Sequence, residues 1–240
     1  MALYLAQRGY DVAVHYNTSA DGAEKVAAKC GGTSVAIKAD LLDESQTAEL
    51  LPEAACRLGQ PISVLVNNAS IFEYDTIETA TKDSWDRHMG SNLRAPFLLT
   101  QALAQQAPKA GTDENGESIA SALVINMLDQ RVRKLTPEFM TYTLAKMGLW
   151  AFTQTAAMGL APHVRVNAIG PGPTLQGVRQ SDAHFAGQRS NTVLERGANP
   201  SDITAALGYF LDAPAVTGQL LCVDGGQHIG WKTQDILGIE

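Results

Sequence analysis

The sequence predicts an α/β fold in which a doubly wound parallel sheet is covered by helices on both faces. Short apolar runs alternate along the chain with longer segments of helical periodicity, an alternation typical of parallel sheets. The 240 residues suffice for one large domain, and 45% of them are hydrophobic. No segment has the length and composition of an interdomain linker, so we expect residues 1–240 to form a single domain.

The elements follow from local patterns. Residues 1–8 have helical periodicity and end at Gly9. Ser19 and Ser201 are expected to cap helices, and Gly31-Gly32 and Gly59 to end them. The expected strands span residues 11–16, 33–38, 62–66, 120–127, 164–168 and 219–223. The further expected helices span residues 19–30, 43–58, 82–106, 138–160 and 201–211, and residues 110–118 are expected to form a polar surface loop.

The first residues predict that the domain is incomplete at its N-terminus. A doubly wound nucleotide-binding sheet is expected to begin with a strand and a Gly-rich turn, whereas residues 1–8 look like the second half of the helix that follows them. The strand from Asp11 and the strand ending at Val66 should then lack their shared neighbour and leave two sheet edges unpaired. Weak cofactor binding and reduced stability are expected for this chain.

Composition excludes several classes of function. The formal net charge of -7 argues against nucleic acid or an anionic membrane as the main partner. Three widely spaced cysteines and five histidines without ligand spacing make a disulfide framework or a metal site improbable. No apolar run approaches the ~20 residues of a membrane span and no signal peptide is evident, so we expect a cytoplasmic protein with a small-molecule substrate.

Tyr142 and Lys146 are the most informative pair. They are one helical turn apart, so the phenol and the ammonium project from the same helix face. A phenol beside a fixed cation ionises more readily, which predicts a proton donor for catalysis near neutral pH. Asp129, thirteen residues before Tyr142, is the third candidate in this group.

Small and polar residues follow several of the expected strands, where folds of this class bind ligands. Asn67-Asn68-Ala69-Ser70 follows a buried strand, but an Asx-rich turn is equally consistent with it. The loop 170–174 allows close approach of a ligand, although strand-ending turns often have this composition. Asn92 lies within a helical pattern, where either a buried bridging role or a polar helix face would fit.

Taken together, these motifs resemble the short-chain dehydrogenase/reductase family in order and spacing over nearly the whole chain. The resemblance implies a Rossmann-type fold, hydride transfer with a nicotinamide cofactor, and a homotetramer. It implies that Tyr142 is the acid, that Lys146 binds ribose and lowers the tyrosine pKa, and that Asn92 belongs to a proton relay. The matching residues are Tyr142-x-x-x-Lys146, Asn67-Asn68-Ala69, Asn92, Pro171-Gly172, Thr217-Gly218 and Asp224-Gly225-Gly226.

Within that family, the chain resembles the pteridine reductase branch. Asp129 replaces the usual serine, and Phe72 follows Ser70 where the branch has a ring that sandwiches the pterin. The resemblance implies that the substrate contacts Ser70, Phe72, Asp129 and Tyr142.

NADP(H) is the expected cofactor. The second strand of an NAD-specific site ends with an acid that repels a 2′-phosphate, whereas residues 16–19 contain none. Thr18 departs from the arginine expected in the pteridine reductase branch, which weakens the expected 2′-phosphate recognition. For Asp40, capping the next helix is the alternative role. The expected cofactor contacts are Asn17, Thr18, Ser19, Asp40, Leu41, Asn68, Ala69, Ser70, Asn126, Lys146, Pro171, Gly172 and Thr174.

Asp129 distinguishes between substrates. A carboxylate would repel the oxyanion that develops when a ketone is reduced, whereas it can accept hydrogen bonds from the amino and amide groups of a pterin. Asp129 should also raise the pKa of Tyr142, opposing Lys146. The sequence therefore favours NADPH-dependent reduction of a pteridine C=N bond. The alternatives are a carbonyl or alcohol reductase acting on a keto-acyl, sugar or polyol substrate, and a cofactor-deficient structural or regulatory oligomer.

Overall fold

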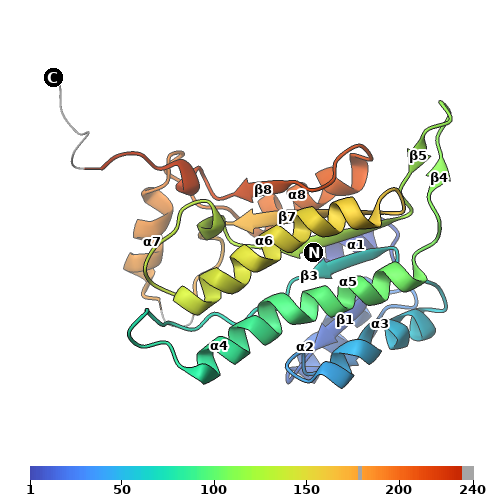
Figure 1. Cartoon of the computed structure of the whole chain (residues 1–240), viewed down its shortest axis with the longest axis horizontal. Helices are drawn as coiled ribbons and strands as arrows, with labels where there is room; N and C mark the ends of the chain where they lie inside the picture. The colour runs from blue at the N-terminus through green and yellow to red at the C-terminus, as the bar shows by residue number, and fades with distance from the viewer. Residues whose placement is uncertain (178–179, 234–240) are drawn as a thin grey trace.

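A computed structural model describes residues 1–177 and 180–233 and has parallel strands covered by helices on both faces (Figure 1). The helices are α1 Ala2–Gln7, α2 Ala20–Cys30, α3 Glu44–Leu58, α4 Lys82–Met89, α5 Ala95–Gln106, α6 Met140–Leu160, α7 Asp182–Ser190 and α8 Pro200–Asp212. The strands are β1 Ala13–Tyr16, β2 Val35–Lys38, β3 Val64–Asn67, β4 Gly111–Thr112, β5 Ser118–Ile119, β6 Ala122–Met127, β7 Val164–Pro171 and β8 Leu220–Val223.

The core lies on both faces of the strands, as the alternating pattern predicts. On one face, Leu50 of α3 and Leu103 of α5 pack with Val124 and Val166 of the sheet. On the other face, Leu5 of α1 and the α8 residues Leu207 and Phe210 pack against the sheet, together with Ile125 and Ile169. Strands β6 and β7 are buried on both faces because helices cover both of them, which explains their nearly continuous apolar sequence.

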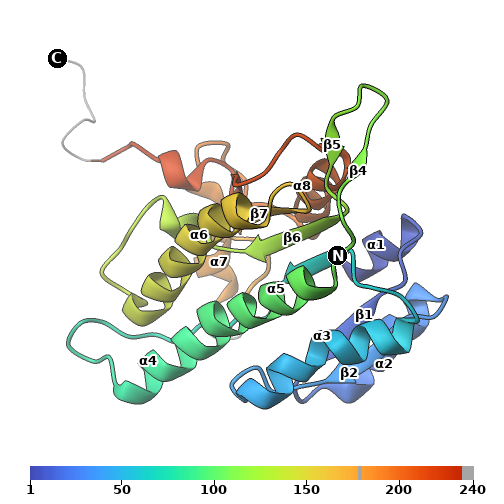
Figure 2. The ribbon, with the colours of Figure 1, turned by 45° about the vertical axis from the view of Figure 1, so that its right-hand side comes forward.

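The parallel strands form two separate sheets, in the orders β1-β2 and β3-β6-β7-β8. Figure 2 shows β1, β2, α2 and α3 grouped beside the four-stranded sheet. Residues of β1 and β3, including Val14 and Val64, line a cavity of about 570 Å³ between the two sheets. Among the described residues, β1 and β3 thus have no strand between them, as expected.

Several predicted boundaries are wrong. Asn199 rather than Ser201 is the N-cap of α8, and its backbone N–H donates to the Asp202 carboxylate over 2.7 Å. Ser19 occupies the N-cap position of α2 as expected, but its side chain makes no capping hydrogen bond. The predicted loop 110–118 is largely a hairpin, because β4 and β5 pair antiparallel within residues 111–119 and project from the body of the molecule (Figure 2).

The helix expected over residues 82–106 is interrupted. A π-helical turn, η1, spans Gly90–Arg94 and separates α4 from α5. Asn92 lies in this turn, and its side-chain bonds to another segment explain why the regular helical ladder is locally abandoned. Helix propensities take no account of contacts with distant segments, so the sequence predicts an uninterrupted helix.

Candidate active site

The site is built at the carboxyl ends of β3, β6 and β7. Tyr142 lies in the first turn of α6, and its buried phenol donates a hydrogen bond of 3.0 Å to Oδ2 of Asp129. Asp129 follows β6, and its Oδ1 accepts from the backbone N–H of Arg131 over 2.8 Å at the start of a 3₁₀ turn, η2 Gln130–Val132. This local bond fixes the carboxylate while its other oxygen faces the phenol.

Lys146 lies on the same face of α6 as Tyr142, as the spacing predicts. Its buried Nζ is 5.7 Å from the centroid of the Tyr142 ring and donates to the carbonyl oxygen of Met127 over 2.8 Å. Burial lowers the pKa of Lys146 to about 8, although Asp129 acts in the opposite direction.

The pKa of Tyr142 is raised well above its usual value, first by burial and then by Asp129. The effect predicted for Asp129 is therefore confirmed. The pKa of Tyr142 thus moves in the direction opposite to the one expected from its spacing to Lys146, because burial and Asp129 both raise it. Arg131 and Ser70 lower the pKa of this phenol, but by less.

Asn92 bridges the backbone of the loop after β3. Its Oδ1 accepts from the N–H of Ile71 and its Nδ2 donates to the carbonyl of the same residue, each over 2.8 Å. The side chain is fully buried, so the bridging alternative is the correct one of the two weighed from the sequence. Asn92 thereby holds the segment that carries Ser70 and Phe72.

Phe72 lies beside Tyr142 within a cluster of rings. It stacks on Phe139 with centroids 4.3 Å apart and meets Tyr142 edge-on at 4.7 Å. Its side chain is 45% exposed despite these contacts, so it can present apolar surface to a ligand. Arg131 lies over the Phe139 ring at 5.1 Å, and Tyr74 meets that ring edge-on.

Phe139 was missed by reasoning from the sequence. It precedes α6 with φ of 54°, a left-handed conformation that is rare for an aromatic residue. Such strain concentrates at functional sites, and here it places the ring against Phe72. The only available signal in the sequence was its position three residues before Tyr142.

A cavity of about 300 Å³ opens beside these groups. Phe72, Asp129 and Arg131 line one part of it, and Gly172 and Phe185 contribute from β7's loop and α7. The predicted substrate residues Ser70, Phe72, Asp129 and Tyr142 are thus brought together, and α7 lies at the same cavity.

The predicted cofactor residues fall into two groups. Asn17 and Asp40 lie together beyond β1 and β2, with 3.5 Å between Asn17 Nδ2 and Asp40 Oδ1. Asn68 and Ala69 line the large cavity between the sheets, with Leu41 on its other side. Thr18 and Ser19 continue from Asn17, whereas Ser70 and Lys146 belong to the Tyr142 group.

Two of these predicted residues have structural partners. The Asn126 side chain is buried between Asn67 and Thr153, accepting from the first and donating to the second over 2.8 and 2.9 Å. Asp40 does not cap α3, because Asp43 holds the N-cap position and its carboxylate accepts from Ser45 and Gln46. Asp40 instead accepts from the N–H of Leu42 over 3.0 Å.

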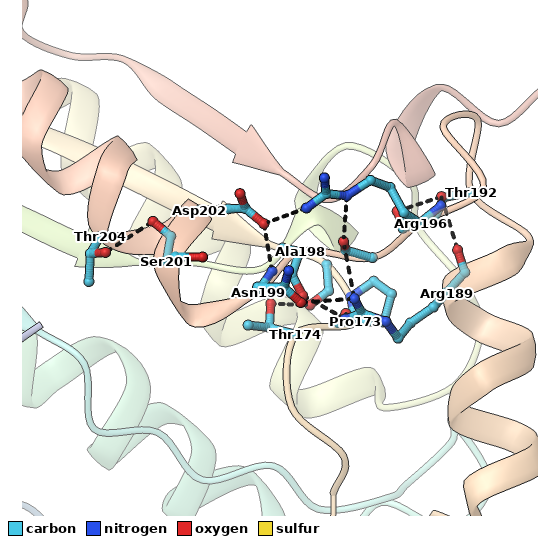
Figure 3. A network of polar contacts seen from close by, with 12 residues as sticks. Pro173, Thr174, Arg189, Thr192, Arg196, Ala198, Asn199, Ser201, Asp202 and Thr204 are labelled. Atoms are coloured by element: carbon cyan, nitrogen blue, oxygen red, sulfur yellow. Dashed lines mark hydrogen bonds and ion pairs between the residues drawn. The ribbon is translucent and has the colours of Figure 1, made fainter.

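The loop after β7 is packed tightly. A Cβ on Gly172 would lie 2.6 Å from Cβ of Asp224, so this position requires glycine. Thr174 donates to the Gly172 carbonyl over 3.0 Å. Figure 3 shows the side chain of Arg189 extending from α7 toward this loop, and its Nη1 donates to the carbonyls of Pro173 and Ala198 over 2.8 and 2.6 Å. The predicted residues Pro171, Gly172 and Thr174 are thereby held at one edge of the cavity beside Asp129.

The residues present fit a nicotinamide dinucleotide. Oδ1 of Asn67 is buried at the end of β3 and has no hydrogen-bond partner among the described residues. Lys146 offers a buried ammonium with three protons beside Tyr142. The end of β1 carries no acid that would repel a 2′-phosphate.

The fold and this arrangement define a short-chain dehydrogenase/reductase, and the chain belongs to that family. Residues 1–228 match the family model described as enoyl-(acyl carrier protein) reductase. Proteins of this family with known structure include NADP complexes that align with this chain, and the chain is an NADP-dependent oxidoreductase.

The chain is similar to FolM alternative dihydrofolate reductase 1 from Brucella suis, whose structure contains NADP. The identity is 39% and the TM-score 0.89, with 98% of this chain and 92% of that chain covered. It is also 30% identical to a probable galactose dehydrogenase, GalD, from Rhizobium meliloti, over 85% of this chain and 78% of that protein. The chain is 29% identical to the 3-oxoacyl-[acyl-carrier-protein] reductase FabG from Staphylococcus epidermidis, over 95% of this chain and 93% of that protein.

Within the described residues, no helix has both the length and the apolar character needed to cross a membrane.

Proposed function

We propose that this protein reduces a C=N bond of a pteridine-type substrate with NADPH. The observation that carries the proposal is the 3.0 Å hydrogen bond from the Tyr142 phenol to the Asp129 carboxylate, at a cavity that Phe72 also lines. The similarity to FolM alternative dihydrofolate reductase 1 supports the same substrate class.

The charge on Asp129 favours a nitrogen substrate over a ketone. Reduction of a ketone develops negative charge on oxygen, which a nearby carboxylate would destabilise. Reduction of a C=N bond instead requires a proton on nitrogen, and a pterin offers amino and amide donors that a carboxylate can accept. The backbone N–H of Arg131 donates a hydrogen bond to the other oxygen of Asp129 and so holds the carboxylate in position to accept from a substrate.

NADPH, when bound, would supply the hydride that the ring carbon of the C=N bond gains. Tyr142 supplies the proton that the ring nitrogen gains, and solvent returns a proton to the phenolate through Asp129. Lys146 would contact the cofactor ribose and keeps a positive charge near the phenolate. Phe72, backed by Phe139, offers a face on which a flat ring can stack.

A carbonyl or alcohol reductase is the second candidate, favoured by the names of the galactose dehydrogenase and 3-oxoacyl reductase relatives. Asp129 argues against it for the reason given above. The homotetramer expected by family analogy and the cytoplasmic location stay predictions.

NADPH oxidation by wild type and Asp129→Ser should be measured with dihydrobiopterin and dihydromonapterin, and in parallel with a 3-oxoacyl thioester and aldose sugars. Wild type should turn over the dihydropterins preferentially. Asp129→Ser should lower kcat/KM for dihydropterins about tenfold or more, corresponding to about 1.4 kcal/mol, without lowering ketone turnover. Asp86→Asn, which changes an exposed carboxylate on α4, is the control.

Full dihydropterin activity in Asp129→Ser would overturn the role of the carboxylate. Turnover of ketones with none of dihydropterins would favour the carbonyl reductase. Failure to oxidise NADPH with every substrate would favour the cofactor-deficient oligomer.

A further inference from the structure

A buried polar cluster lies behind the Tyr142 site and takes no part in the chemistry proposed above. It consists of Asp75 from the loop after β3, His88 from α4 and Thr141 from the start of α6. The three side chains come from three separate segments, and all are buried. Buried polar groups of this kind must satisfy one another, so their protons can be assigned.

Asp75 receives the hydrogen bonds on one side of the cluster. Its carboxylate accepts from the backbone N–H of Thr141 over 3.1 Å, from the Ser84 hydroxyl over 3.0 Å and from the Thr141 hydroxyl. Burial acts to raise the pKa of Asp75, but the bonds from Thr141 and Ser84 outweigh it, and the pKa is lowered. The carboxylate is therefore charged and acts only as an acceptor.

The tautomer of His88 follows from this acceptor. The single hydroxyl proton of Thr141 is given to Asp75, so the imidazole Nδ1, 2.7 Å from Thr141 Oγ1, must be the donor in that pair. On the other side of the ring, Nε2 is 3.1 Å from the backbone N–H of Glu73 and must accept. His88 is neutral, with its proton on Nδ1.

The two ends of this chain of bonds adjoin the two key groups of the site. Glu73 follows Phe72 in the chain, and Thr141 precedes Tyr142. His88 also meets the Tyr142 ring edge-on, with 6.0 Å between ring centroids. The ring of His88 thus connects the segment that carries the stacking aromatic to the helix turn that carries the proton donor.

We propose that His88 is a positioning residue whose neutral ring holds Phe72 in register with Tyr142, and that protonation of this ring in mild acid releases Phe72. The role in catalysis rests on the proposed function. A proton on Nε2 would place two donors, the ring N–H and the Glu73 N–H, against each other and break that bond. The charged and titratable groups facing the ring are Asp75, Glu73, Arg87 and Tyr142.

The direction of titration agrees with a neutral ring at neutral pH. Burial lowers the pKa of His88 and is the largest effect; Asp75, Glu73 and a bond to the Ser84 backbone raise it by less, and Arg87 lowers it with the smallest effect. The ring therefore gains its proton at lower pH than an ordinary histidine, and the release of Phe72 belongs to the acid side of neutrality.

Two substitutions separate the halves of the connection. His88→Gln can present an oxygen acceptor near the position of Nε2 and cannot titrate, so it should retain the Glu73 bond. His88→Asn can present a donor near the position of Nδ1, so it should retain the Thr141 bond and lose the one to Glu73. Thr141→Ser keeps the hydroxyl and is the conservative control, whereas Thr141→Val removes it.

The structural test uses the full chain without substrate. In wild type, ¹⁵N chemical shifts of His88 should report the Nδ1–H tautomer, and hydrogen exchange of the Glu73 amide should quicken about tenfold, relative to neighbouring amides, as the ring is protonated. His88→Gln should show no such acid step, and His88→Asn should exchange quickly throughout. An Nε2–H tautomer, or a Glu73 amide unaffected by acid in wild type, would overturn the inference.

The kinetic test follows KM and kcat for dihydropterins from pH 5 to pH 8. Wild type should show a rise in KM at the acid end with a smaller change in kcat, His88→Gln should lose this rise, and His88→Asn should have a KM about tenfold higher throughout. An acid rise unchanged in His88→Gln would overturn the catalytic role. If the Nδ1–H tautomer and the acid-dependent exchange of the Glu73 amide are observed but dihydropterins are not turned over, the proposed substrate is rejected. The connection of Glu73 to Thr141 through His88 would then still be supported.

Discussion

The Tyr142 phenol donates its hydrogen bond to the Asp129 carboxylate, over 3.0 Å, rather than to a neutral acceptor. The pair stabilises the protonated phenol, because ionisation would place two negative charges side by side. Burial acts in the same direction, and the pKa of Tyr142 is raised well above its usual value. The phenol of Tyr142 is therefore kept protonated, as the proposed role of proton donor requires.

Asp129→Asn should lower the pKa of Tyr142, because it removes the neighbouring charge and leaves a neutral acceptor. Absorbance titration of phenolate near 295 nm measures this, with Tyr142→Phe subtracted to isolate one of the six tyrosines. The Tyr142 phenolate should form at lower pH in Asp129→Asn than in wild type. An unchanged titration would mean that burial alone sets the pKa of this phenol.

Lys146 should impose an alkaline limit on activity. Its pKa is about 8, so the ammonium loses its proton as pH rises through that value, and its bond to Met127 and its proposed contact with the cofactor ribose weaken. Activity, measured as kcat/KM between pH 6 and pH 10, should fall above about pH 8. Lys146→Arg should retain its charge and move this fall to higher pH. The exposed Lys109→Arg is the control; an identical alkaline fall in Lys146→Arg would assign it to another group.

Phe139 should contribute to substrate affinity through its ring rather than through its backbone. Phe139→Gly relieves the left-handed φ but removes the ring stacked on Phe72, while Phe139→Leu retains apolar volume without stacking. Loss of an aromatic pair worth about 0.5–1.5 kcal/mol predicts a KM for substrate raised roughly 2- to 12-fold in both variants. A normal KM in Phe139→Leu would show that stacking is not required.

Arg189 should fix the loop after β7 for cofactor binding. Arg189→Gln removes charge-assisted bonds to Pro173 and Ala198, which should lower the free energy of unfolding by about 2–3 kcal/mol and weaken NADPH binding. Denaturant unfolding and NADPH fluorescence titration measure the two effects. Arg94→Gln, which breaks an exposed ion pair with Glu44, should leave both nearly unchanged. Equal effects in the two variants would contradict the specific role of Arg189.

The cavity between β1 and β3 should be visible in hydrogen exchange. In β3, the amides that bond to β6 should exchange slowly, whereas those that face the cavity should exchange quickly. The same geometry predicts weak NADPH binding, because predicted cofactor residues lie on both sides of the cavity. Uniformly slow exchange along β3, or a low-micromolar dissociation constant for NADPH, would contradict these expectations.

The sequence predicted those parts of the site that local spacing determines. Tyr142 and Lys146 share a helix face because one turn separates them, and Asn92 was recognisable as a polar residue in an unfavourable helical setting. The loops after β3 and β7 were placed correctly because carboxyl ends of parallel strands meet at one edge.

The remainder depends on contacts between distant segments. Nothing local predicts a left-handed aromatic residue at position 139, since its conformation is imposed by the rings around it. The association of Asp75, His88 and Thr141 likewise appears only when α4 packs on α6. The π-helical turn escaped prediction because its stabilising bonds are made by Asn92 to a loop about twenty residues earlier.

This π-helical turn has a further consequence for the geometry of the site. A π-helical turn contains one residue more than an α-helical turn. It therefore rotates the side chains of the preceding helix by about 100° about the helix axis, relative to an uninterrupted helix. The turn therefore sets the angular phase between α4, which carries His88, and α5, which packs in the core. A single-residue deletion within residues 90–94 would rotate His88 out of line with Thr141 while leaving every side chain of the site chemically intact. The length of this short segment therefore sets the geometry of the His88–Thr141 contact.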